Sequence, residues 1–310
     1  MTSGDFINLC IAALLLAGIY AAMSVGMTII YGVMKIVNLA HAGFLMLGAY
    51  MAFELYERFH IDPLVGAVLT LPVFFVFGVV VYDLLVRRLP KSDVPTLSSL
   101  LLMFGLWLVL QNFAYLIWQN EDRSIDTPLT IAVLHLSDIT IPTLRLIVFA
   151  AAVTSVVILE VVLHRTWFGK SVGALIQNPY AAQVFGVDDR KTSRMSFGLG
   201  TGFAGFAGAL LATIYSFSPD FGRPFLLRAF VIIVLGGLES ASGVALGAMV
   251  LAFVETFSIN VPLPWHSREG WSWVYLPASY QPAVAYALLV VVLLILPGGI
   301  AGLLKKRKLA

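Results

Sequence analysis

The sequence predicts an all-α polytopic membrane protein with about nine transmembrane or partly re-entrant helices. Of its 310 residues, 60% are hydrophobic and only 12% are charged, whereas soluble domains carry about 25% charged residues. Many uncharged runs also reach the ~20 residues that an α-helix needs to cross a bilayer. A soluble protein would need far more polar surface than this composition provides. The whole chain, residues 1–310, is therefore expected to form one transmembrane domain.

Nine apolar segments follow one another along the chain, separated by charged residues, prolines and glycines that interrupt helices. The N-terminal residues carry no positive n-region and no small-residue cleavage site, so we interpret the first segment as a span and not as a signal peptide. The seventh and eighth segments flank the glycine-rich stretch LGGLESASG, and either of them is short enough to be re-entrant. The nine segments are residues 6–34, 36–53, 63–82, 94–120, 142–163, 195–218, 224–238, 240–259 and 282–304.

Two of the connections between these segments also carry structural signals. Residues 121–141 are polar and rich in turn formers, and the weak alternation in LTIAVLHLSDITI indicates a small extracytoplasmic hairpin or cap. Residues 260–281 are rich in proline and tryptophan, which is typical of the aromatic belt at a membrane surface. Both connections are expected outside the core of the bilayer.

The distribution of lysine and arginine predicts the orientation in the membrane. If the loop after the third segment is cytoplasmic, 13 of the 19 lysines and arginines lie on the cytoplasmic side, in agreement with the positive-inside rule. The other six are Arg58, Arg123, Arg145, Arg223, Arg228 and Arg268. An odd number of segments then places the N-terminus outside and the C-terminus, with its KKRK cluster, in the cytoplasm.

Residues 165–194 form the longest charged interruption between the later apolar segments. Within it, Asn178 is a good N-cap residue, and Pro179 is tolerated at the first helical position, where the N–H has no partner. Gly186 can end the helix, because glycine adopts the left-handed conformation without a Cβ clash. The sequence therefore predicts a short helix from Pro179 to Phe185 in a polar loop, an element suited to docking a partner protein.

The sequence contains no pattern typical of a catalytic or metal-binding site. It has no P-loop, no H-E-x-x-H motif and no cluster of Cys and His ligands, and its five histidines are scattered. The single cysteine, Cys10, excludes an internal disulfide. We therefore expect a protein that is not an enzyme and that has no cofactor and no metal site. Any energised work must draw on an ion gradient or on another subunit.

Small residues are spaced for close helix packing in two of the later segments. Gly198 and Gly202 in the sixth segment follow the G-x-x-x-G pattern, as do Gly243 and Gly247 in the eighth. In lipid this spacing lets helix backbones approach each other closely. Packing inside the protein is the first interpretation, and a subunit interface is the alternative.

Polar residues inside apolar segments are costly in a bilayer and indicate either a pathway or a paired structural contact. Asn38 and His41 lie three residues apart and are expected to share one face of a helix. His41 either lines a polar path or bonds a backbone carbonyl. Glu239 falls in the glycine-rich turn, where a solvated or capping role is expected. The other candidates are Gln111, Asn112, Glu255 and, nearer an outer end, Glu54.

Three blocks of the sequence carry a family resemblance that covers nearly the whole chain. They are GMTIIYGVMKIVNLAHAGFLMLGAY at residues 26–50, the charged loop with the following helix at residues 165–210, and LRAFVIIVLGGLESASGVALGAMV at residues 227–250. These blocks resemble the permeases of branched-chain amino acid ABC transporters, of the type usually called the H subunit. The resemblance implies a single transmembrane permease domain with a cytoplasmic coupling loop at residues 165–194.

The coupling loop of ABC permeases often reads E-A-A-x-x-x-G, and residues 180–186 keep the two alanines and the glycine but have tyrosine in place of the glutamate. Small Ala181 and Ala182 permit close approach to a groove, while Val184 and Phe185 offer apolar anchors. The residues that the resemblance assigns to ATPase coupling are Asn178, Pro179, Tyr180, Ala181, Ala182, Phe185 and Gly186.

The resemblance also implies the partners and the cargo. The partners are a homologous second permease subunit, two cytoplasmic ATP-binding subunits, a periplasmic substrate-binding protein and membrane lipid, with no nucleic acid. Together they would import branched-chain or related amino acids across the bacterial inner membrane. The expected pathway residues are Tyr31, Asn38, His41 and Glu255. Permeases for urea, short-chain amides or other small solutes are similar and stay open as alternatives, as do an ion-driven secondary transporter and a membrane scaffold.

Overall fold

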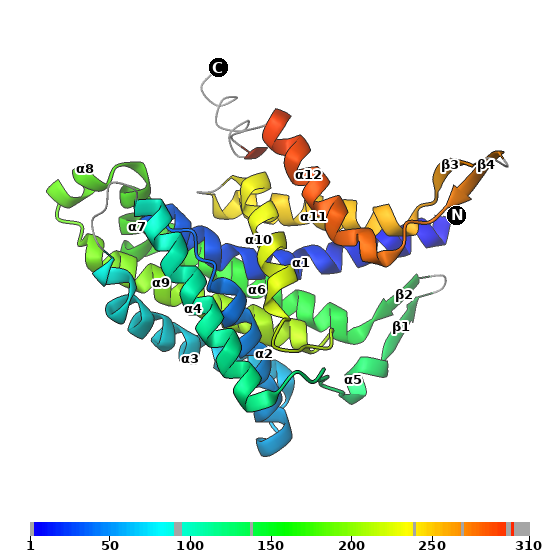
Figure 1. Cartoon of the computed structure of the whole chain (residues 1–310), viewed down its shortest axis with the longest axis horizontal. Helices are drawn as coiled ribbons and strands as arrows, with labels where there is room; N and C mark the ends of the chain where they lie inside the picture. The colour runs from blue at the N-terminus through cyan, green and yellow to red at the C-terminus, as the bar shows by residue number, and fades with distance from the viewer. Residues whose placement is uncertain are drawn as a thin grey trace.

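The computed structural model describes residues 3–89, 95–136, 139–237, 240–267, 270–295 and 299–300. They form a bundle of long helices with two small β-hairpins (Figure 1). Within these ranges, six helices are long and apolar enough to cross a membrane, namely Gly4–Met34, Pro63–Arg88, Leu97–Trp118, Thr143–Arg165, Asp189–Ala212 and Ser242–Asn260. The prediction of a largely helical, multi-pass membrane protein is therefore confirmed. Glu239 and the KKRK cluster at residues 305–308 lie outside the described residues.

Each of the nine predicted segments contains one helix. These are α1 (Ser3–Met34), α2 (His41–Phe59), α3 (Pro63–Leu84), α4 (Pro95–Trp118), α6 (Thr143–Arg165), α9 (Asp189–Ala212), α10 (Gly222–Gly236), α11 (Ala241–Asn260) and α12 (Gln281–Ile295). Four predicted boundaries are wrong by more than a turn, namely both ends of α2 and both ends of α9. Helix α2 ends six residues late, at Phe59, and α9 ends six residues early, at Ala212. Helix α2 begins five residues late, because residues 35–38 form a non-helical break. Helix α9 begins six residues early, because the Asp188 carboxylate caps it by accepting a hydrogen bond from the Lys191 N–H at 2.9 Å.

The shorter elements lie in the connections. The loop between α4 and α6 contains α5 (Pro128–Ile131) and a hairpin in which β1 (Val133–Leu136) pairs antiparallel with β2 (Ile139–Pro142), so the predicted hairpin is confirmed. A second hairpin, β3 (Leu263–Ser267) with β4 (Gly270–Val274), occupies the stretch predicted as an aromatic belt, where no strands were expected. Both hairpins lie at one end of the bundle, and α7 (Trp167–Gln177) and α8 (Pro179–Val184) lie at the opposite end (Figure 1). Two 3₁₀ turns complete the elements, η1 (Val86–Arg88) and η2 (Ala278–Tyr280).

Helix α9 is the central helix of the bundle and packs against α1, α2 and α3. Its glycines let these backbones come into direct contact. Gly200 faces Gly26 of α1 so closely that a Cβ on either one would lie 2.5 Å from the carbonyl oxygen of the other. A Cβ on Gly48 of α2 would overlap the backbone of Gly205, and one on Gly208 would overlap the Leu45 carbonyl. No side chain larger than hydrogen fits at these crossings without a shift of the helices.

The two G-x-x-x-G pairs both pack inside the protein, which confirms the first interpretation of them. Gly198 and Gly202 of α9 face the α3 backbone, at the carbonyl oxygens of Phe75 and Leu71. In α11, Gly243 faces the Gly236 backbone of α10, and Gly247 faces the next turn of the same helix. The structure therefore uses this spacing for helix contacts within one chain.

The central crossing gives a stability prediction. Gly48→Ala should destabilise the protein by about 1–3 kcal/mol, because its new methyl group meets the Gly205 backbone. Gly105→Ala in α4 is the matched control, because a Cβ there has nothing within 4 Å. The measurement is the temperature at which half of the detergent-solubilised protein loses its monodisperse size-exclusion peak. Equal midpoints for the two variants would show that the α2–α9 crossing tolerates a side chain.

Candidate functional site

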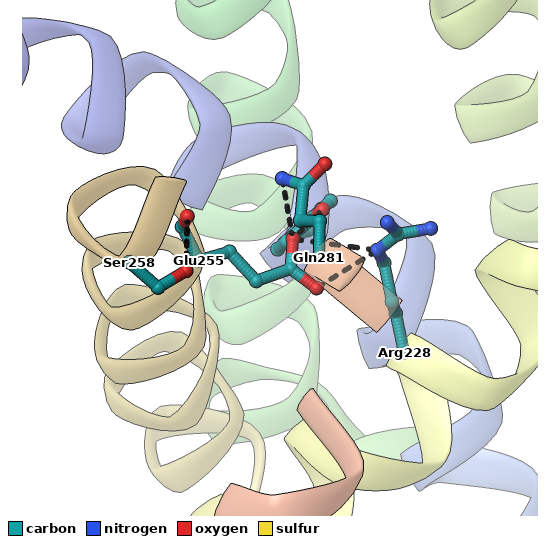
Figure 2. A network of polar contacts seen from close by, with 5 residues as sticks. Arg228, Glu255, Ser258 and Gln281 are labelled. Atoms are coloured by element: carbon teal, nitrogen blue, oxygen red, sulfur yellow. Dashed lines mark hydrogen bonds and ion pairs between the residues drawn. The ribbon is translucent and has the colours of Figure 1, made fainter. Parts of the chain in front are cut away.

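Glu255 of α11 lies at the centre of a buried polar network that joins four helices (Figure 2). Its side chain is completely buried. Oε1 accepts a hydrogen bond from Arg228 Nε of α10 at 3.0 Å, and Oε2 accepts one from the Tyr20 hydroxyl of α1 at 2.6 Å. The side-chain amide of Gln281, the first residue of α12, donates to Oε2 at 3.2 Å. One carboxylate therefore ties α1, α10, α11 and α12 together.

The partners of Glu255 offset the free-energy cost of burying its charge. A carboxylate enclosed in an apolar bundle is strongly disfavoured unless it is paired and hydrogen-bonded. Arg228 supplies the opposite charge with only 12% of its side chain exposed, and its guanidinium carbon lies 5.7 Å from the centre of the Phe225 ring. Such a pair adds little stability by itself, but the loss of one partner leaves an uncompensated buried charge. The network therefore specifies how these four helices meet.

Sequence reasoning finds Glu255 but misses its partners. The charge count places Arg228 with the outer-side residues but does not predict that it is largely buried in α10 and paired with Glu255. The pairing of Arg228 could have been inferred from the sequence, because Arg228 lies inside the apolar segment 224–238 and charged residues within spans usually pair with one another. Tyr20 and Gln281 give no such signal, because the sequence does not show which helices become neighbours.

A cavity of about 310 Å³ adjoins the network and shares Gln281 with it. One wall is apolar and is built mainly from α1. The polar lining groups come from α6, α11, α12 and the loop after α9. The apolar lining residues are Leu9, Ala12, Leu15, Leu16, Ile19, Ile214 and Ile259, and the polar ones are Arg145, Tyr215, Thr256, Asn260 and Gln281.

Asn38 and His41 do not share a helix face, contrary to the prediction. Asn38 lies in the non-helical break between α1 and α2, whereas His41 is the first residue of α2. Both side chains are completely buried, and His41 Nε2 lies 2.8 Å from the Met23 carbonyl oxygen of α1. Of the two roles considered for His41, the structure shows the bond to a backbone carbonyl. Met23 is one turn from Tyr20, so the His41 contact and the Glu255 network occupy neighbouring turns of α1.

The break also contains buried polar atoms that are not satisfied. Within the described ranges, the side-chain oxygen and nitrogen of Asn38 and the Nδ1 of His41 have no hydrogen-bond partner. Tyr31 lies in the last turns of α1, where its ring centre is 5.8 Å from Lys35 Nζ. Tyr31, Asn38 and His41 thus lie within, or a few residues from, the break between α1 and α2, whereas Glu255 belongs to the buried network on α11.

The remaining polar candidates make local structural contacts. Gln111 of α4 donates to a carboxylate oxygen of Asp220 at 2.7 Å. Asn112 bonds a carbonyl oxygen of its own helix. Glu54 accepts a hydrogen bond from the Trp118 indole at 2.6 Å. The Gln111 and Glu54 contacts join α4 to neighbouring elements, and the Asn112 contact lies within α4.

The predicted short helix in the charged loop is confirmed as α8. The Asn178 side chain caps it by accepting a hydrogen bond from the Ala181 N–H at 3.1 Å, and Pro179 is the first helical residue. Gly186 ends it in the left-handed conformation, with φ of +85°. The sequence reasoning missed α7, which precedes α8 and is amphipathic.

Helix α8 has one buried side and one exposed apolar side. Ala182 is buried with Val172 and Leu175 of α7. The other side presents the α8 apolar face, defined as Tyr180, Val184 and Phe185, whose side chains are 84–88% exposed. Three large exposed apolar side chains on so short an element are typical of a protein-binding surface. Helix α7 in turn contacts α1, α6 and α9, so α8 is connected to the bundle.

Comparison with known proteins gives matches along most of the chain. Residues 9–293 match the family described as "Branched-chain amino acid transport system / permease component". The chain is 25% identical over 298 residues to the high-affinity branched-chain amino acid transport system permease protein LivH of Escherichia coli (strain K12), covering 93% of this chain and 92% of LivH. It is 24% identical over 294 residues to BraD of Pseudomonas aeruginosa, covering 91% of each protein. LivM of Escherichia coli (strain K12) is 26% identical over 272 residues, which cover 75% of this chain and 60% of LivM. No solved structure gives a significant match.

The buried ion pair predicts strong non-additivity. Glu255→Leu and Arg228→Met should each destabilise the protein by about 3–5 kcal/mol, because each leaves a buried charge without its partner. The double variant should be clearly more stable than either single one. Asp83→Leu is the control, because the Asp83–Arg194 pair is partly exposed and its loss should cost about 1 kcal/mol or less. Thermal midpoints of the solubilised proteins provide the measurement, and simple additivity would contradict a paired role.

Proposed function

The chain belongs to the family of branched-chain amino acid transport system permease components, and from this premise we propose that it is the membrane permease subunit of an ATP-binding cassette importer for branched-chain or related amino acids. The observation that carries the proposal is the match to the family and to LivH over nearly the whole length. The multi-pass helical bundle supports it, because a permease needs several spans to enclose a path.

In this proposal, other subunits supply the energy and the substrate. ATP is hydrolysed by two cytoplasmic ATP-binding subunits, since the sequence has no P-loop. A periplasmic binding protein delivers the amino acid at the outer face of the bacterial inner membrane. The second permease subunit is a homologue of this chain, and the similarity of this chain to both LivH and LivM supports such a pair.

The proposed orientation has nine crossings, with the N-terminus outside and the C-terminus in the cytoplasm. The arrangement of the ends supports it, because α7 and α8 lie at the end of the bundle opposite the two hairpins (Figure 1). Residues 165–194, the proposed cytoplasmic coupling loop of a single permease domain, carry five positive residues, Arg165, Lys170, Arg190, Lys191 and Arg194. Such enrichment is typical of the cytoplasmic side.

The α8 apolar face is the proposed contact with an ATP-binding subunit. Tyr180 and Phe185 insert into a groove of that subunit, and Ala181 permits close approach. Asn178, Pro179 and Gly186 fix the start and the end of the helix. Ala182 faces α7, so its role in the proposal is to anchor α8 to the bundle and not to touch the partner.

The proposed pathway passes between α1, α2 and α11, beside Tyr31, Asn38, His41 and Glu255. Three of these four side chains are completely buried, so the path is closed in this arrangement. Opening it requires α1 to move relative to α2 and α11, which exchanges the contacts made by His41 and Glu255. The unsatisfied amide of Asn38 is suited to bonding a polar group that enters the break.

The docking proposal predicts the effect of a charge on α8. Phe185→Asp should abolish co-purification of the ATP-binding subunits and ATP-dependent uptake, because a desolvated carboxylate would oppose insertion into an apolar groove. The protein should still reach the membrane, since Phe185 is 88% exposed. Ile131→Asp is the matched control, because Ile131 is 86% exposed and lies in α5 beside the hairpin at the other end. Retained co-purification in Phe185→Asp would contradict the docking role.

Transport itself is tested with the complete importer in proteoliposomes. Uptake of leucine is expected to require ATP and the binding protein, and not a sodium or proton gradient. Urea and acetamide, tested in the same vesicles, separate the alternative small-solute permeases. Gradient-driven uptake without the ATP-binding subunits would instead indicate a secondary transporter.

A further inference from the structure

We propose that the cavity between α1, α6, α11 and α12 binds a zwitterionic amino acid, with Arg145 contacting its carboxylate and the side-chain oxygens of Asn260 and Gln281 contacting its ammonium group. The inference rests on the proposed function and assigns substrate contacts that the proposed pathway does not include. All three residues line the cavity.

Arg145 is a cation without an acidic partner within the described ranges. It is the third residue of α6, it is exposed, and it makes no ion pair or hydrogen bond with any residue that the structure describes. A positive charge is disfavoured at the N-terminus of a helix, where the backbone dipole is itself positive. An anion at this place would be attracted by both the guanidinium and the helix terminus. A carboxylate that enters the cavity therefore supplies the negative charge that Arg145 and the N-terminus of α6 both attract.

The two amide side chains have defined orientations that leave acceptors available. Gln281 uses its NH₂ group to donate to Glu255 at 3.2 Å, and Asn260 uses its NH₂ group to donate to the Thr256 carbonyl at 2.7 Å. Carboxylate and carbonyl oxygens can only accept, so the amide oxygens must lie on the other side. Figure 2 shows the Gln281 oxygen pointing away from Glu255. Neither oxygen has a donor within the described chain, and an ammonium group supplies three.

The size and the apolar wall fit an aliphatic side chain. The volume of about 310 Å³ is at the lower end of the ~300–1,000 Å³ typical of small-ligand pockets. Leu15, Leu16 and Ile19 of α1 form part of the apolar wall. Urea and short amides have no carboxylate for Arg145 and would leave this wall uncovered. The cavity therefore favours an amino acid with a hydrocarbon side chain over these alternatives.

The site is also connected to the buried ion pair. Gln281 lines the cavity, and its side-chain nitrogen donates a hydrogen bond to Glu255. An ammonium group bound to the side-chain oxygen of Gln281 would contact the same amide group that donates a hydrogen bond to Oε2 of Glu255. Occupation of the cavity and the arrangement of α1, α10 and α11 are thus linked through one side chain.

Binding is tested by protection of a thiol in the cavity wall. Ala12→Cys in a Cys10→Ser background is introduced into the complete permease complex in nanodiscs, and modification by N-ethylmaleimide is followed with and without L-leucine. We expect L-leucine to slow modification, and Arg145→Gln to raise the concentration for half-protection by about tenfold or more, since a charged hydrogen-bond pair is lost. Leucinol, which has no carboxylate, should protect weakly and equally in both backgrounds.

Arg223→Gln is the matched control and should leave protection unchanged. Arg223 is likewise an exposed arginine in the first turn of a helix, α10, but it does not line the cavity. Equal half-protection in the Arg145→Gln and unsubstituted backgrounds would overturn the proposal. Protection by added phosphatidylglycerol without protection by leucine would overturn it in favour of a lipid site.

Uptake measurements separate this inference from the proposed function. If the complete importer shows no ATP-dependent leucine uptake, the proposed function fails, whatever the thiol experiment shows. If uptake is present and Arg145→Gln has the same half-saturating leucine concentration and the same protection, only the cavity assignment fails. A raised half-saturating concentration, with unchanged leucine affinity of the binding protein, supports the assignment.

Discussion

The direct contact of helix backbones around α9 is the constraint on which the rest of the bundle depends. In lipid, burial of apolar side chains against one another gains little over their contact with acyl chains, so close packing must hold the helices together. Gly200 against Gly26 and Gly205 against Gly48 provide it, because these crossings leave no room for a Cβ. With α9 fixed against α1, α2 and α3, helices α4, α6, α10 and α11 are positioned by their contacts with α1 or α2, and α12 by its contacts with α10 and α11.

The other half of the bundle is held by a different kind of interaction. Helices α10 and α11 approach at Gly236 and Gly243, but the four-helix junction is specified by the Glu255 carboxylate and its three donors. Backbone packing is insensitive to charge, whereas an ion pair can be exchanged for contacts with a charged solute. A permease needs both kinds of interaction. The backbone crossings of α9 keep one half of the bundle together, and the Glu255 network is a junction whose partners can change.

The sequence predicts the part of this structure that depends on local signals. Apolar length and helix-breaking residues locate one helix in each predicted segment, and Asn178, Pro179 and Gly186 predict α8 almost to the residue. The wrong predictions occur where tertiary contacts determine the ends of helices and the partners of side chains. The break at residues 35–38 has no proline or glycine, and Asp188 extends α9 into a charged stretch that hydropathy excludes. Glu255 is recognisable as a costly polar residue, but its pairing with Arg228 depends on which helices are adjacent, and no local pattern records that.

Helix α1 connects the two ends of the molecule that the proposed function needs to couple. Near its C-terminal end, Gly32 lies beside Ile176 of α7, the helix that carries α8. Twelve residues earlier, Tyr20 bonds Glu255, which corresponds to about 18 Å along a continuous helix. A helix without a proline or a break over this distance tilts as one body, because each turn is bonded to the next. In the proposed function, a partner bound to α8 would displace α7 and thereby tilt α1 through the contact of Ile176 with Gly32. The glycine crossing with α9 would keep α1 in place along its length, so that this tilt would change the Tyr20–Glu255 bond and the adjoining cavity.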